Sequence, residues 1–228
     1  MRIIFVRHGH PDYTLDCLTE LGHKQAEAVA KRLEGETIHK ICASTKGRAM
    51  ETAAHIAQLK GMEVEYYDFM REIGWGPVDD EPLFEKGHPW LTVYDMVARG
   101  QSLLSANWAQ EEPFCRNKVV GYVEDVGRNL DAWLEQFGYF REGEYYRVKG
   151  GSDQTVVMVS HGGSSSAALA RLFNLPFPQM LRIISPTFTA ITIVNLKGED
   201  GSLAAPRFDL VNDARHISGI TAETVFEQ

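Results

Sequence analysis

The sequence of 228 residues has few of the features that mark several large classes of protein. Its three cysteines, Cys17, Cys42 and Cys115, are odd in number, widely separated and without C-x-x-C spacing. This pattern argues against a disulfide framework and a zinc site, and we expect reduced, mostly structural thiols. No apolar run approaches the roughly 20 residues that a membrane-spanning helix needs, so we expect no membrane partner.

Runs of basic residues are also missing, and the formal net charge is −8, so we expect no nucleic-acid partner. The chain starts with a strand pattern rather than a basic-then-apolar leader, which predicts a cytoplasmic location. It has neither internal repeats nor low-complexity segments, and its length fits one domain over residues 1–228. The sequence leaves a homodimer open.

The N-terminal stretch carries the strongest functional signal. Ile3 to Val6 is an apolar run of strand formers that stops at Arg7-His8-Gly9. A second apolar run, Thr155 to Val159, ends in Ser160-His161-Gly162-Gly163. Adjacent parallel strands would bring both imidazoles to one edge of a sheet, where open α/β folds hold their ligands.

The segments between these strands predict the fold class. Thr19 is a candidate N-cap for a helix through about Leu33, after a loop from Pro11 to Cys17. Ile38 to Ala43 predicts a strand, and Ser44 is a candidate N-cap for a helix to Lys60. Further predicted elements are a strand from Met62 to Tyr67, a helix after His161 that stops at Asn174, and closing strands at 188–196 and 207–211. This alternation predicts a three-layer α/β sandwich with a mostly parallel central sheet and helices on both faces.

Residues from about Gly76 to Gly150 differ in composition. Trp90, Trp108 and Trp133 lie here, with Trp75 at the boundary, and several prolines interrupt the pattern. Lys118 to Phe137 has apolar residues at helical spacing. We interpret 76–150 as a helical cap insertion over the sheet edge. Its tryptophans are either core residues or a platform for a leaving group with ring or apolar character.

Two arginines join the histidines. Arg7 precedes His8, and Arg48 is expected in the first turn of the helix after Ser44, where free N–H groups favour an anion. Two guanidinium forks beside two imidazoles suit the oxygens of a phosphoryl group.

Four motifs together resemble the histidine phosphatase (phosphoglycerate-mutase-like) superfamily, over about two-thirds of the chain. They are Arg7-His8-Gly9, Leu18-Thr19-x-x-Gly22-x-x-Gln25-Ala26, Ser44-x-x-x-Arg48-Ala49-x-x-Thr52-Ala53 and Ser160-His161-Gly162-Gly163. The resemblance implies a phosphomonoester hydrolase in which His8 becomes a phosphohistidine. Arg7, Arg48 and His161 would hold the phosphoryl oxygens, with Gly162 lining the substrate site. Nearby guanidiniums disfavour imidazolium, which keeps His8 neutral for attack.

The resemblance also implies an acid after the third strand, and Glu72 in Arg71-Glu72-Ile73-Gly74-Trp75 is the candidate. It would protonate the leaving oxygen and then activate water. The alternative is a solvated Glu72 paired with Arg71, and Asp79, Asp80 and Glu81 are rival acids. We expect no cofactor and no metal.

Position 10 departs from the family, which usually has Glu, Gln or Asn there. His10 either lines the pocket and contacts a substrate oxygen or is merely structural. The segment Asn212–His216 resembles the family's closing segment and is expected to be structural.

Parts of the sequence resemble the patterns of three other functions. His8-Gly9-His10-Pro11-Asp12 imitates the His-x-His-x-Asp core of dinuclear metallohydrolases, but Tyr13 stands where that motif expects histidine, and Arg7 and Arg48 would be unexplained. A phospho-ligand binder without turnover would not need both His8 and Glu72. A phosphoglycerate-mutase-type phosphotransferase should carry extra basic residues in the insertion. Residues 73–150 instead hold 13 acidic and eight basic side chains, which favours a phosphatase acting on a phosphorylated small molecule.

Overall fold

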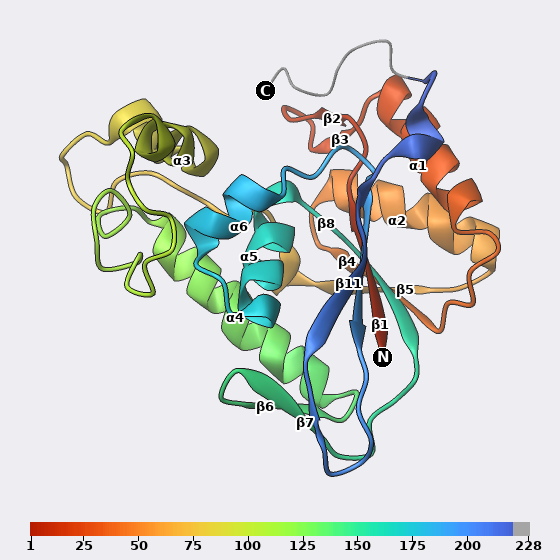
Figure 1. Cartoon of the computed structure of the whole chain (residues 1–228). Helices are drawn as coiled ribbons and strands as arrows, with labels where there is room; N and C mark the ends of the chain where they lie inside the picture. Colours follow the sequence, from red (N-terminus) through yellow and green to blue (C-terminus); the bar gives the residue numbers. More distant parts are fainter. Residues whose placement is uncertain (221–228) are drawn as a thin grey trace.

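The computed structural model describes residues 1–220, and its centre is a six-stranded sheet (Figure 1). The strands, in spatial order, are β11 (Pro206–Asp213), β9 (Ile191–Leu196), β1 (Arg2–Arg7), β8 (Thr155–Ser160), β4 (Lys40–Ser44) and β5 (Val64–Tyr67). β1, β8, β4 and β5 pair in parallel, whereas β9 is antiparallel to its neighbours β1 and β11. The predicted mostly parallel sheet is therefore confirmed, and the predicted closing strands form its antiparallel side.

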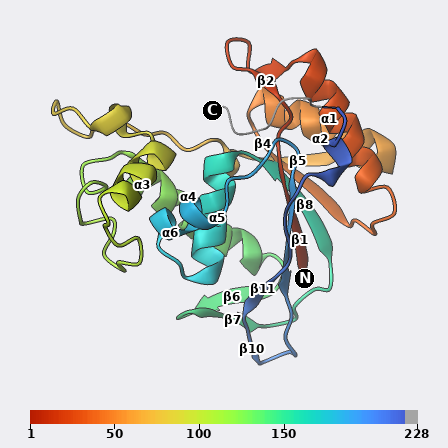
Figure 2. The ribbon, with the colours of Figure 1, turned by 45° about the horizontal axis from the view of Figure 1, so that its top comes forward.

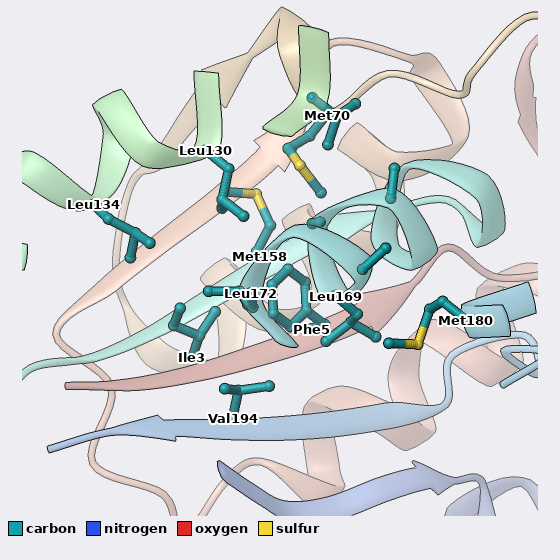
Figure 3. Close-up of a cluster of buried hydrophobic side chains, with 14 of the residues drawn as sticks. Ile3, Phe5, Met70, Leu130, Leu134, Met158, Leu169, Leu172, Met180 and Val194 are labelled. Atoms are coloured by element: carbon teal, nitrogen blue, oxygen red, sulfur yellow. The ribbon is translucent and has the colours of Figure 1, made fainter. Parts of the chain in front are cut away.

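Both faces of the sheet are buried, which is why β1 is apolar throughout. Side chains alternate along a strand, so Ile3 and Phe5 join one buried cluster while Ile4 and Val6 join the other. In Figure 3 the labelled side chains of β1, β8 and β9 lie against apolar side chains of the helices that cover this face. These labelled residues are Ile3, Phe5, Met70, Leu130, Leu134, Met158, Leu169, Leu172, Met180 and Val194.

Helices cover both faces and complete the three-layer sandwich that the sequence predicts (Figures 1 and 2). On one side lie α1 (Glu20–Arg32) and α2 (Gly47–Lys60). On the other lie α4 (Val119–Glu135), α5 (Gly162–Phe173) and α6 (Phe177–Ile183). Within residues 1–220, none of the helices has the length and apolar character needed to cross a membrane.

The helix ends confirm two predictions and correct one. The Thr19 hydroxyl accepts the N–H of Gly22 and caps α1, and Asn174 ends α5 in the left-handed conformation at φ 54°. Ser44 was predicted as the N-cap of the second helix, and this is wrong. Ser44 is the last residue of β4, and the N-cap position of α2 is Lys46. The chain turns from the strand into the helix through Thr45 and Lys46, so the Ser44 hydroxyl bonds the N–H of Lys46 and not an N–H of α2.

The segment from 76 to 150 contains α3 (Pro89–Ala98), the predicted long helix α4, and the strands β6 (Tyr139–Glu142) and β7 (Tyr145–Val148). With β10 (Leu203–Ala204), β6 and β7 form a small separate sheet. α4 lies in the helical layer on the sheet face, because Leu130 and Leu134 share a buried cluster with β1 and β8. The cap boundaries at 76 and 150 stay a prediction.

The loop predicted between Pro11 and Cys17 is a short hairpin, and the prediction of a plain loop is wrong here. β2 (Pro11–Asp12) pairs antiparallel with β3 (Cys17–Leu18). The hairpin folds back because the Thr19 N–H donates to the carbonyl of His10 at 3.0 Å. This return brings Gly22 of α1 so close to the chain after His8 that a Cβ on Gly22 would lie 2.1 Å from the His10 carbonyl oxygen.

Two helical glycines offer a matched test of this close approach. In Gly22→Ala the new methyl group meets backbone atoms, so we expect a loss of about 1–3 kcal/mol in the free energy of unfolding. In Gly121→Ala, within the exposed part of α4, a Cβ meets nothing within 4 Å. There we expect a gain of about 0.5–1 kcal/mol from helix propensity. Urea unfolding measures both, and equal changes in the two variants would contradict the packing argument.

Candidate active site

The site lies at the edge of the sheet where three parallel strands end. Arg7 of β1 pairs with Ser160 of β8, so His8 and His161 follow side by side. Their ring centroids lie 5.0 Å apart. Ser44 ends β4, the next strand, and Arg48 follows in the first turn of α2. The predicted meeting of both imidazoles at one sheet edge is confirmed.

His8 is buried and held in one orientation. Its Nδ1 lies 2.7 Å from the Gly9 carbonyl oxygen, which can only accept, so Nδ1 carries the proton. Nε2 is then a bare lone pair, and it accepts a hydrogen bond from Arg48 Nε at 3.3 Å. Burial, and next the charge of Arg7, hold the pKa of His8 well below its usual 6.5, so the ring is neutral at pH 7.

Two guanidiniums flank His8. Arg7 donates to the Pro186 carbonyl at 2.7 Å, and its guanidinium lies 4.0 Å from the ring centroid of Phe188. Arg48 is buried and forms an ion pair with Asp16 through Nη1. Both cations are thus fixed in place on elements that also position His8.

Glu72 lies at the N-terminus of α5, the helix that follows His161. One carboxylate oxygen accepts the N–H groups of Ile73 at 3.0 Å and Ser164 at 3.2 Å. Gly163 makes room, because a Cβ there would lie 2.5 Å from that oxygen. Burial raises the pKa of Glu72, against the opposing effects of Arg7 and the two N–H groups.

The alternative contacts and carboxylates considered for the acid differ from those of Glu72. Arg71 does not pair with Glu72, because its Nη1 lies 3.4 Å from Asp68. Asp79 forms an exposed ion pair with Arg116 at 3.0 Å, and Asp80 and Glu81 are exposed. Glu72, in contrast, accepts a hydrogen bond from the first turn of α5, the helix whose N-cap residue is His161.

Ser44 is bound to the second histidine, which sequence reasoning missed. The Ser44 Oγ lies 2.9 Å from Nε2 of His161, and it also accepts the Lys46 N–H at 3.2 Å. The fully buried Nδ1 of His161 has no hydrogen-bond partner among the residues that the structure describes. Burial, and next the proximity of His8, hold the pKa of His161 well below 6.5. The ring is therefore neutral and carries one proton, which lies on Nδ1 if the Ser44 hydroxyl donates to Nε2.

His10 and Gly162 lie at the margin of the site. His10 Nδ1 lies 2.9 Å from the Thr19 hydroxyl, and its ring is 5.5 Å from that of Phe188. A Cβ on Gly162 would lie 3.5 Å from the Trp90 ring and 3.9 Å from Arg7 Nε. The role of His10 stays a prediction.

The closing segment braces the loop that carries Phe188. Asn212 accepts the Thr187 N–H at 2.8 Å and donates to the Ser185 carbonyl at 3.0 Å. Asp213 forms an ion pair with Arg215, and His216 lies 3.1 Å from the Thr189 hydroxyl. These contacts hold the loop of residues 185–189 in place, which is the kind of role expected of a structural segment.

The four tryptophans divide into two groups. Trp133 is buried in the core, and the half-buried Trp108 packs against the core residues Phe114 and Phe177. Trp90 is half-buried beside Gly162, and Trp75 is exposed against His88. Only Trp90 contacts the margin of the site directly.

Asp16 and Tyr13 are the other residues that the sequence did not reveal. The Tyr13 ring centroid lies 5.3 Å from the Arg48 guanidinium. Their proximity to Arg48 depends on the hairpin, for which the sequence carries no clear turn signal. Across residues 1–220, no three side chains of His, Cys, Asp or Glu are arranged to hold a metal ion.

Comparison with known proteins agrees with this geometry. A model of the histidine phosphatase superfamily, branch 1, matches residues 3–208. The glucosyl-3-phosphoglycerate phosphatase of Mycobacterium tuberculosis is 26% identical over an alignment of 229 residues, which covers 95% of this chain and 96% of that protein. A probable phosphoglycerate mutase of Photorhabdus laumondii is 32% identical over 141 residues, covering 53% of this chain and 66% of that protein.

A solved structure extends the agreement to the fold. The native structure of a mycobacterial glucosyl-3-phosphoglycerate phosphatase matches with a TM-score of 0.64 and 26% identity, over 92% of this chain and 98% of that one. The fold, the sequence motifs and the family match lead to one conclusion: the chain belongs to the histidine phosphatase superfamily, in its first branch.

Proposed function

We propose that this protein hydrolyses phosphomonoesters of small molecules through a phosphohistidine on Nε2 of His8. The observation that carries the proposal is the orientation of His8. Its Nδ1–H is committed to the Gly9 carbonyl, and its Nε2 lone pair faces Arg48. A neutral, oriented imidazole between two guanidiniums is suited to attack on phosphorus.

In the first step, the Nε2 lone pair forms a bond to phosphorus while the bond from phosphorus to the leaving oxygen breaks. Glu72 gives its proton to that oxygen, which its burial-raised pKa favours. Arg7, Arg48 and the Nδ1–H of His161 donate to the phosphoryl oxygens, where negative charge must be stabilised.

In the second step, water attacks phosphorus and the bond to Nε2 breaks. The Glu72 carboxylate takes the water proton, inorganic phosphate leaves, and His8 and Glu72 return to their starting protonation states. The two N–H groups on Glu72 stabilise its carboxylate form between the steps.

The leaving group would pass over Gly162, where the absence of a side chain keeps the surface between Trp90 and Arg7 uncovered. Contact with the Trp90 ring would favour a leaving group with ring or apolar character, and His10, whose ring lies 5.5 Å from that of Phe188, would line the site. Relatives named as a glucosyl-3-phosphoglycerate phosphatase and a probable phosphoglycerate mutase support a small phosphorylated metabolite.

Mutase activity is the second candidate, because one relative is named a probable phosphoglycerate mutase. The net charge of −5 over residues 73–150 disfavours retention of a bisphosphate, so we propose that water is the acceptor. Interconversion of phosphoglycerates with a bisphosphate primer would favour the mutase.

His8→Ala tests the nucleophile. On a panel of an aryl phosphate, a sugar phosphate and a phosphoglycerate, kcat should fall by about 10³-fold or more. Rapid quenching of the wild type should trap a phosphate on protein that is stable in alkali and released in acid. His23→Ala, between α1 and α2 and beside His55, is the control and should retain activity. Undiminished turnover in His8→Ala would refute the mechanism.

Glu72→Gln tests the acid through the pH profile of kcat/KM. Wild-type activity should rise with pH through the lowered pKa of His8 and fall as pH rises through the raised pKa of Glu72. The amide cannot titrate, so the variant should lose this alkaline fall and lower kcat by about 10²- to 10³-fold. Because both profiles are measured with the same substrate, the ionisation of the substrate affects them equally. An unchanged alkaline limb would assign the acid to another group.

Ser44→Ala tests the orientation of His161. Loss of the hydroxyl leaves Nε2 of His161 without its hydrogen-bond partner, so the ring proton can lie on either nitrogen. We therefore expect kcat to fall about 10- to 100-fold. Ser165→Ala removes a comparably buried serine, whose Oγ lies 2.6 Å from that of Ser160, and should change kcat less than about twofold. Similar losses in both variants would indicate a general packing effect.

A further inference from the structure

We propose that Asp16 is a positioning residue that turns one edge of the Arg48 guanidinium toward the phosphoryl group. The inference rests on the proposed function, because it assigns a role within the same phosphate pocket. Asp16 does not contact His8, and we expect it to affect the reaction through Arg48.

The carboxylate of Asp16 holds Arg48 at two points. One oxygen forms the ion pair with Nη1 of Arg48, and the other accepts the N–H of Gly47 at 3.0 Å. Gly47 is the residue directly before Arg48 and the first residue of α2. The same carboxylate therefore fixes both the backbone from which the side chain starts and the guanidinium in which it ends.

This clamp leaves a particular edge of the guanidinium available. A guanidinium has two forks of parallel N–H donors, one formed by Nη1 and Nη2 and the other by Nε and Nη2. Asp16 occupies Nη1, while Nε points at Nε2 of His8 at 3.3 Å. The fork of Nε and Nη2 thus faces the place where phosphorus must bond to His8, and it matches two phosphoryl oxygens.

The chain adopts an unusual conformation to deliver Asp16. The Asp12 carboxylate accepts the N–H groups of Thr14 at 2.8 Å and Leu15 at 3.1 Å, which shapes the hairpin turn. Asp16 then has a φ of 53°, in the left-handed region that residues other than glycine rarely adopt. A Cβ on Gly47 would lie 2.1 Å from the Asp16 carbonyl oxygen. Backbone strain and close approach both accompany this contact, as expected where a loop serves a site.

A competing interpretation is that Asp16 imitates the substrate and blocks the pocket. The geometry argues against it, because Asp16 binds Nη1 and leaves the fork of Nε and Nη2 uncovered. The two interpretations predict opposite changes in anion affinity. Removing a positioning carboxylate weakens anion binding, whereas removing a competitor strengthens it.

The variant Asp16→Asn decides between the two interpretations. Orthovanadate is the probe, because bound vanadium becomes five-coordinate, as phosphorus does in the transition state of phosphoryl transfer. We expect the inhibition constant for vanadate to rise and kcat/KM to fall about 10- to 100-fold. Asp12→Asn is the matched control, since it removes one charge from the same hairpin and can still accept both N–H groups. It should change either quantity less than about twofold. Tighter vanadate inhibition, or unchanged kcat/KM in Asp16→Asn, would overturn the inference.

Two further variants separate positioning from folding. Asp16→Gly removes the carboxylate and suits the left-handed backbone, so it should fold and show the same loss. In an Arg48→Gln background, Asp16→Asn should add less than about a twofold loss, because its effect passes through Arg48. Equal losses in both backgrounds would contradict positioning. Failure of the wild type to turn over any phosphomonoester would instead refute the proposed function.

Discussion

A neutral imidazole buried between two guanidiniums is the constraint on which the rest of the site depends. His8 can be a nucleophile only while it is uncharged, and burial together with Arg7 and Arg48 makes the charged form unfavourable. The guanidiniums in turn need fixed partners, because unpaired charges at a buried site are unfavourable. The Pro186 carbonyl and Asp16 supply them. The same cations that keep His8 neutral are suited to receive a phosphoryl group.

Much of this arrangement could be predicted from the sequence, since it follows from local rules. Apolar strands that end in His-Gly predict two imidazoles at one sheet edge, and the register of Arg7 with Ser160 confirms this. The first-turn position of Arg48 and the cap at Thr19 are equally local signals. The fold class follows from the same alternation of strands and helices.

What could not be predicted depends on contacts between distant segments. Asp16 meets Arg48 only because a hairpin turns the chain back, and Ser44 meets His161 only because β4 lies beside β8. A serine before a helix is usually a cap, and that local rule led to a wrong prediction for Ser44. Glu72 was predicted from the family resemblance, but the position of its carboxylate at the N-terminus of α5 depends on the absence of a Cβ at Gly163.

The pairing of β1 with β8 has a consequence for how the protein acquires activity. The two strands that His8 and His161 follow are separated by about 150 residues of chain, which must be synthesised before the strands can pair. No N-terminal fragment that ends before β8 contains the second histidine or the strand against which β1 packs. Turnover therefore reports that nearly the whole chain is assembled, and catalysis can serve as a measure of complete folding in this protein.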